Sequence, residues 1–151
     1  MDAVVVPGSF LDVLGRLLLA TLFGACIGLN REAEGKPAGL KTHALVALGA
    51  ATLTIVGQLL QNGDSGAPSR VVQGIVAGVG FIGAGVILHR HDGGGIEGLT
   101  TAAAIWVVAA IGVAAGAGLW RTAGSAVVVA LVLLVVGETV DRWVHKDQPR
   151  S

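Results

Sequence analysis

The chain alternates between long apolar segments without charge and short stretches that carry most of its ionisable residues. Uncharged runs cover residues 42–60, 71–88 and 98–120, with lengths of 19, 18 and 23 residues. A helix needs about 20 consecutive apolar residues to cross the hydrocarbon core of a bilayer. The three runs therefore predict three membrane-spanning helices, since a soluble helical domain rarely contains several such runs in succession.

Two further spans are predicted on either side of these runs. Residues 10–29 are apolar apart from Asp12 and Arg16, which lie four positions apart, in the order that favours an ion pair on one helix face. Residues 122–137 are short, but this span extends to Trp143 if its acidic residues lie at the membrane surface. All four prolines are expected between spans. We predict an all-α integral membrane protein, a compact bundle of about five transmembrane helices over residues 1–143, with a short cytoplasmic tail at 144–151.

The basic residues are distributed unequally between the two sides of this predicted bundle. Cytoplasmic loops of membrane proteins carry an excess of Lys and Arg. With five spans, and with Arg16 set aside, only Arg70 and Arg121 lie on one side, and seven residues lie on the other: Arg31, Lys36, Lys41, Arg90, Arg142, Lys146 and Arg150. The first loop and the C-terminus are therefore expected in the cytoplasm and the N-terminus outside. With four spans this bias would weaken, because one terminus would change sides.

Small residues recur at four-residue spacing in the predicted spans, as in Gly24 with Gly28 and Gly112 with Gly116. Such rows allow helix backbones to approach closely in a membrane. The pattern predicts glycine-rich packing, and the rows could serve contacts within the bundle or contacts between copies in a homo-oligomer. The glycines concerned are Gly24, Gly28, Gly74, Gly78, Gly80, Gly83, Gly85, Gly112 and Gly116.

Composition excludes several classes of function. Charged residues make up 13% of the chain, against about 25% in soluble domains, and the formal net charge is zero. The chain has no basic stripe, so a nucleic-acid partner is not expected. The single cysteine, Cys26, excludes an intrachain disulfide and a CxxC site.

Catalytic signatures are also missing. The GxGxxG string at residues 78–83 lies midway through an apolar run, without the preceding strand and turn that a dinucleotide site requires. The sequence contains neither a GxSxG elbow nor an HExxH motif. We therefore predict that the protein is not an enzyme and uses no cofactor.

Two groups of polar residues are candidates for function. The three uncharged runs contain no Asp or Glu, so no metal site is predicted there. Polar residues inside a membrane are by default functional candidates, although Asp12 and Arg16 could equally form a structural pair. The intramembrane candidates are Asp12, Arg16, Gln58, Gln73, Thr100 and Thr101. In the first loop, the candidates for a docking or packing surface are Arg31, Glu32, Lys36, Lys41, Thr42 and His43.

Three stretches, in this order and spacing, resemble the MgtC/SapB family of bacterial membrane proteins: GACIGLNREAEGKPAGLKTHALVALGAA, GIVAGVGFIGAGVIL and GLTTAAAIWVVAAIGVAAGAGLW. The resemblance implies a multi-helix protein of the bacterial inner membrane, with some members linked to Mg²⁺ limitation, acid or phosphate homeostasis and survival in host cells. Family members commonly show Glu-Arg-Glu where this chain has Asn30, Arg31 and Glu32. Many also carry a cytoplasmic regulatory domain after the last span, and its functions are not carried over to this chain.

The resemblance and the residues leave two functional hypotheses. The first is a non-catalytic regulator or scaffold in Mg²⁺ or ion homeostasis or stress adaptation, acting through helix contacts with a membrane transporter or ATP synthase. The second is a channel or transporter for Mg²⁺ or another small solute, formed by a homo-oligomer within the lipid bilayer. In that case Asp12, Arg16, Gln58, Gln73 and Thr101 would line the path.

Overall fold

Five long helices make up the fold. The structure, a computed structural model, describes residues 8–61, 66–87 and 98–144. Its helices are α1 (Phe10–Ala33), α2 (Leu40–Leu59), α3 (Ala67–Ile87), α4 (Leu99–Gly116) and α5 (Trp120–Val144). Each is long and apolar enough to cross a membrane, which confirms the predicted all-α bundle of five spans. Arg90, Lys146, Arg150 and the tail beyond Val144 lie outside the described residues.

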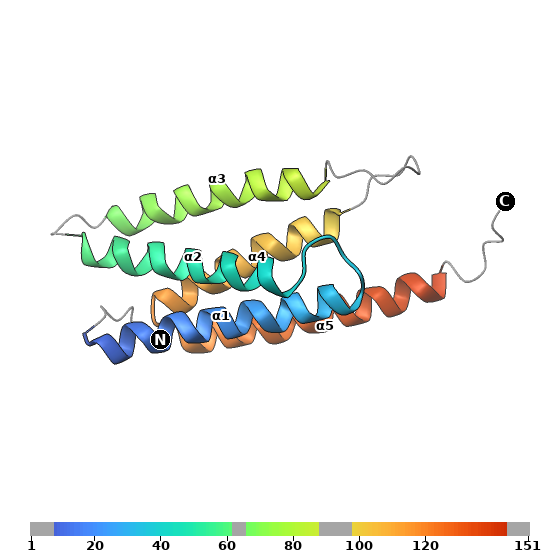
Figure 1. The fold of residues 1–151 in the computed structure, drawn as a ribbon, viewed down its shortest axis with the longest axis horizontal. Helices are drawn as coiled ribbons and strands as arrows, with labels where there is room; N and C mark the ends of the chain where they lie inside the picture. Colours follow the sequence, from blue (N-terminus) through green and yellow to red (C-terminus); the bar gives the residue numbers. More distant parts are fainter. Residues whose placement is uncertain (1–7, 62–65, 88–97, 145–151) are drawn as a thin grey trace.

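The helices run up and down along one axis, and α4 lies at the centre of the bundle (Figure 1). Helix α4 contacts all four other helices, whereas α3 contacts only α2 and α4 in the described part of the chain. In Figure 1, α2 and α4 form a middle layer between α3 and the pair α1 and α5. We call the end that carries the α1–α2 loop and the start of α4 the loop end, and the opposite end the N-terminal end.

Two of the helix ends are closed by the same glycine motif. At the end of α1, Gly35 N–H donates to the carbonyl of Glu32 and Lys36 N–H donates to the carbonyl of Arg31, both at 3.0 Å. Gly35 has φ +65°, and Gly118, which follows α4 in an equivalent arrangement, has φ +78°. Glycine favours this left-handed conformation because it lacks a Cβ. These turns reverse the chain within a few residues and set the antiparallel order of the helices.

The central contacts are made where glycine lets backbones meet. A Cβ added at Gly28 would lie 2.7 Å from Leu40 Cα, and one added at Gly116 would lie 2.6 Å from the carbonyl oxygen of Ala51. Gly24 and Gly112 lie as close to the backbone of α2. Helix α2 is therefore held between α1 and α4 by backbone contacts that a larger residue would obstruct.

The sequence left open whether the glycine rows pack within the bundle or between copies, and most glycines of α3 have no close contact in the described part of the chain. Among the described residues, added Cβ atoms at Gly74, Gly78, Gly80 and Gly85 would meet no atom within 4 Å, and Gly83 would reach only Ala102, at 3.5 Å. Gly83 is buried, whereas the other four glycines are exposed, and Gly74 and Gly78 line an open groove between α3 and α2.

Two boundaries also differ from the prediction. The first turn of α3 contains Pro68, which was expected to lie between spans. A proline is tolerated there because the first N–H groups of a helix have no intrahelical acceptor. Helix α4 ends at Gly116 and not near Trp120, because the turn at Gly118 separates α4 from α5.

Candidate functional site

Glu32 joins the end of α1 to the start of α2. Its Oε2 accepts a hydrogen bond from Leu40 N–H at 2.8 Å, and the first turn of α2 has no other side-chain cap at Gly39. A carboxylate at a helix N-terminus satisfies an otherwise free donor and complements the helix dipole. Glu32 was predicted to belong to a docking or packing surface. In the structure its carboxylate joins the end of α1 to the start of α2 and so fixes the loop between them.

Arg31 is almost fully buried at the loop end, with 1% of its side chain exposed. It forms an ion pair with Glu34, whose Oε1 also accepts a hydrogen bond from Asn30 Nδ2 at 2.8 Å. Arg31 Nε and Nη1 have no hydrogen-bond partner among the described residues. A buried guanidinium with two free donor groups is costly, so this is a place where water or a partner could bind.

The same cluster reaches α5 through Glu138. Lys36 Nζ lies 3.7 Å from Glu138 Oε1, and the carboxyl groups of Glu34 and Glu138 are close enough to share a hydrogen bond. Burial raises the pKa of Glu34, and its hydrogen bond with Glu138 raises it further, while Arg31 and Asn30 lower it. We call Asn30, Arg31, Glu34, Lys36 and Glu138 the loop-end cluster. It joins α1, the first loop and α5.

His43 is fully buried beneath this cluster, where α1 and α2 are closest. Its Nδ1 lies 2.9 Å from the carbonyl oxygen of Gly39, so Nδ1 is the protonated nitrogen and donates this bond. Nε2 is then an acceptor, and it has no partner in the described part of the chain. A Cβ at Gly24 would lie 2.6 Å from the carbonyl oxygen of His43, and one at Gly28 would lie 3.0 Å from His43 Cβ, so α1 packs directly against α2 at this residue.

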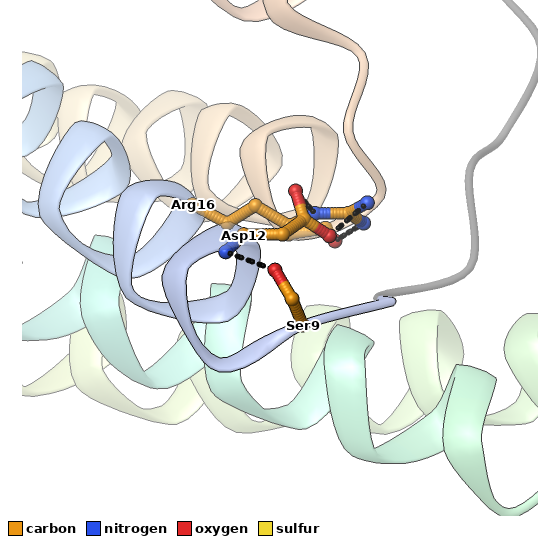
Figure 2. Close-up of polar contacts among 4 residues, drawn as sticks. Ser9, Asp12 and Arg16 are labelled. Carbon is orange, nitrogen blue, oxygen red and sulfur yellow. Dashed lines mark hydrogen bonds and ion pairs between the residues drawn. The ribbon is translucent and has the colours of Figure 1, made fainter.

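A second polar cluster lies at the N-terminal end, where Asp12 and Arg16 form an ion pair (Figure 2). Arg16 Nη2 lies 2.9 Å from Asp12 Oδ2, while Nη1 donates to the carbonyl oxygen of Gly116 at 2.9 Å. Ser9 Oγ accepts from Asp12 N–H and begins α1 (Figure 2). Arg16 also lies over the Trp120 ring, 5.9 Å from its centroid. The pair therefore attaches α1 to the end of α4, which is the structural alternative left open by the sequence.

The other intramembrane candidates do not come together. Gln58 is buried near the end of α2, at the N-terminal end, and its Oε1 has no partner among the described residues. Thr101 is buried in the first turn of α4, at the loop end, and Gln73 is exposed on α3. The structure therefore separates these side chains and does not align them along one path through the bundle.

The remaining loop candidates are less enclosed. Lys41 is exposed, and Thr42 is half-buried at the start of α2. Within the described residues, no group of three or more His, Cys, Asp or Glu side chains is arranged to hold a metal ion. Asn30, Glu34 and Glu138 were not among the predicted site residues. The spacing of Asn30, Arg31 and Glu34 on one helix turn could have indicated the local contacts, but Glu138 is brought to them only by the fold.

These features define a multi-pass helical membrane protein with buried charge at both ends of its bundle. The model of the MgtC family matches residues 17–143, and the chain belongs to this family. Protein SrpB of Synechococcus elongatus is 47% identical over 80% of this chain and 72% of its own length. The putative magnesium transporter YhiD of Escherichia coli K12 is 44% identical over 87% of this chain. Protein SapB of Bacillus subtilis is 41% identical over 91% of it.

The chain spans less than two thirds of some of these relatives. The alignment covers 64% of YhiD and 61% of SapB. No solved structure matches the chain.

Proposed function

We propose that this chain is a non-catalytic regulator or scaffold of the bacterial inner membrane that acts through helix contacts with other membrane proteins. We infer that the process it regulates is Mg²⁺ or ion homeostasis, by analogy with YhiD, which is named as a putative magnesium transporter. A transporter or an ATP synthase is the kind of partner that the family resemblance suggests. The excess of Lys and Arg supports a cytoplasmic loop end and C-terminus, with the N-terminus outside.

The open glycine face of α3 is the observation that supports this proposal best. A glycine inside a helix is less favourable than alanine by about 1 kcal/mol. In α1 and α4 the glycines Gly28 and Gly116 allow backbone contact with α2. On α3, a Cβ added at Gly74 or Gly78 would meet no described atom within 4 Å, and the two glycines lie one turn apart along an open groove beside α2. A neighbouring helix of another protein or another copy would make use of this face.

The proposal can be tested by complementation with two matched glycine variants. Gly78→Leu places a bulky side chain on α3. Gly137→Leu does the same on α5, where an added Cβ also meets no described atom within 4 Å. A strain that lacks the protein should grow in low Mg²⁺ with the wild type or Gly137→Leu, but not with Gly78→Leu. Thermal unfolding of the purified variants should show that all are folded. Full complementation by Gly78→Leu would contradict the proposed contact.

A channel or transporter is the second candidate, favoured by the name of YhiD. Reconstitution of the purified chain in liposomes and measurement of Mg²⁺ flux separates the two functions. Robust, saturable flux that is abolished by Asp12→Ala without loss of the folded state would contradict the regulator. Absence of flux at protein densities confirmed in the same vesicles would instead contradict the transporter.

A further inference from the structure

Two arginines in the described part of the chain are almost fully buried, and the fold provides a complete set of partners for only one. Arg16 and Arg31 each have 1% of their side chain exposed. Arg16 Nε and Nη2 contact the carboxylate of Asp12, and Nη1 donates to the carbonyl oxygen of Gly116. Arg31 pairs with Glu34 through Nη2, but its Nε and Nη1 have no hydrogen-bond partner among the described residues. The same buried group is thus satisfied at the N-terminal end and only partly satisfied at the loop end.

The facing helix presents the complementary group. His43 is completely buried, and its Nδ1 donates to the carbonyl oxygen of Gly39. Nε2 therefore carries a lone pair and acts as an acceptor, yet it has no partner in the described chain. Asn30 Oδ1 is another buried acceptor without a described partner, and its side chain donates to Glu34 beside Arg31. Buried groups of this kind are costly to leave unpaired, so native proteins pair them with a protein group or an ordered water.

Arg31 and His43 lie at one contact between α1 and α2. A Cβ added at Gly28 would lie 3.0 Å from His43 Cβ. Arg31 follows Gly28 by three positions, which places the two residues on the same face of α1. The guanidinium of Arg31 is also close enough to act electrostatically on the His43 ring, although no hydrogen bond joins these two described side chains. The unpaired donors of α1 and the unpaired acceptor of α2 are therefore enclosed in the same place.

A ligand at this place has to accept hydrogen bonds from Arg31 and donate to His43. Water does both, and a buried water typically makes about three hydrogen bonds to polar groups that otherwise lack a partner. A halide accepts from the guanidinium, but it has no hydrogen to donate to Nε2, and the Glu34 carboxylate beside Arg31 repels it. The charge of Arg31 likewise repels a metal cation at the His43 nitrogen. Water is the ligand that fits all of these groups.

We propose that Arg31 and His43 form a buried water site at the loop end, in which bound water accepts from Nε and Nη1 of Arg31 and donates to Nε2 of His43. Through this water the end of α1 is hydrogen-bonded to the first turn of α2. The site joins two helices at the loop end, as the contacts of Arg16 join α1 to α4 at the N-terminal end. It contains no residue of α3, so it does not rest on the proposed function.

The experiment is radiolytic labelling of the full chain in detergent with pulsed X-rays, followed by identification of the oxidised residues by mass spectrometry. X-rays form hydroxyl radicals from bound water as well as from bulk water, so a buried side chain is oxidised when a bound water lies beside it. His43 is the reporter. Pro37, which is exposed in the first loop, is the control for bulk water, because a radical scavenger in the buffer suppresses its labelling.

Two matched variants test the partner of the water. Arg31→Met keeps the unbranched stem of the side chain and removes the donors that lack a described partner. Arg16→Met makes the same change in an equally buried arginine whose three nitrogens all have partners within the chain. The reporter His43 is present in both variants.

In the wild type, we expect oxidation of His43 that persists at a scavenger concentration at which Pro37 is no longer labelled. This labelling should be lost in Arg31→Met and retained in Arg16→Met. Suppression of the His43 label together with that of Pro37 would overturn the buried water, and this result requires no variant to fold. A scavenger-resistant label that is unchanged in folded Arg31→Met, or lost equally in both variants, would overturn the assignment to Arg31. Stabilisation of the wild type by chloride relative to gluconate in thermal unfolding, absent in Arg31→Met, would overturn the water in favour of a bound anion.

Discussion

Replacing Arg16 tests whether this side chain holds α1 and α4 together or lines a path for a solute. Arg16→Met keeps the unbranched apolar stem but removes the guanidinium that joins α1 to the carbonyl oxygen of Gly116. A hydrogen bond to a charged group contributes about 1.5–3 kcal/mol, and the carbonyl left behind loses its partner in a buried place. Asp12 is 32% exposed and can be hydrated when its partner is lost, so it adds little. We expect Arg16→Met to reduce the free energy of unfolding by about 2–3 kcal/mol.

Asp12→Asn provides the comparison, because it keeps the hydrogen bond between Arg16 and Gly116. The amide that replaces the carboxylate can still accept a hydrogen bond from Arg16, but the guanidinium, which is only 1% exposed, loses its counter-charge, so the change costs more than the roughly 0.2–1 kcal/mol of a fully exposed pair. We therefore expect a clear order of stability, with Asp12→Asn between the wild type and Arg16→Met, which loses both the ion pair and the hydrogen bond to Gly116.

The assay is thermal unfolding in one detergent, followed by tryptophan fluorescence and by circular dichroism, with Mg²⁺ flux of each variant measured in liposomes. Trp120 lies beside Arg16, so one of the three tryptophans is placed to report on this contact. The clamp interpretation is refuted if Arg16→Met unfolds at the wild-type temperature. It is also refuted if Asp12→Asn changes flux while leaving unfolding unaltered.

Three further predictions concern the loop end and the helix contacts. Gly28→Ala should destabilise the bundle by about 1–3 kcal/mol through overpacking, whereas Gly78→Ala should be neutral or slightly stabilising in the isolated chain, as thermal unfolding of both would show. Glu32→Ala should lower stability by about 1 kcal/mol through loss of the cap on α2, and Glu32→Gln, which can still accept the hydrogen bond, should recover part of this loss. The pKa of Glu34 is raised above its usual 4.5 in the folded protein, so its contribution to stability is present below that pH and is lost as the pH rises through the folded-state pKa. Unfolding measured from pH 4 upward should show this loss in the wild type and not in Glu34→Gln; equal pH dependence in both proteins would contradict it.

The sequence predicted the helices well because lipid imposes a strong constraint on composition. A span must be apolar over about 20 residues, and this property is local and easy to read. Ion pairs within one helix can also be predicted from the sequence. The four-residue spacing of Asp12 and Arg16 predicted the ion pair that forms. The acceptor of Arg16 could not be predicted, because the Gly116 carbonyl belongs to the backbone and lies 100 residues away in the sequence.

The candidate site at the loop end was predicted only in its local part. Arg31, Glu32 and His43 were candidates because they are polar side chains directly beside long apolar segments. Their roles depend on what faces them: Glu32 caps a neighbouring helix, and Arg31 is buried against Glu34. The approach of Glu138 from α5 is a tertiary contact, and neither periodicity nor charge pattern contains that information.

The glycine rows show most clearly where sequence and fold contribute different information. Gly24 with Gly28 and Gly74 with Gly78 have the same spacing, and spacing determines only that two small residues share a helix face. The fold places the first face against α2 and leaves the second open. The same motif therefore stabilises the chain itself in α1 and is available to another molecule in α3. Substituting one glycine from each row separates folding from association, because only the first row has backbone within reach of an added side chain.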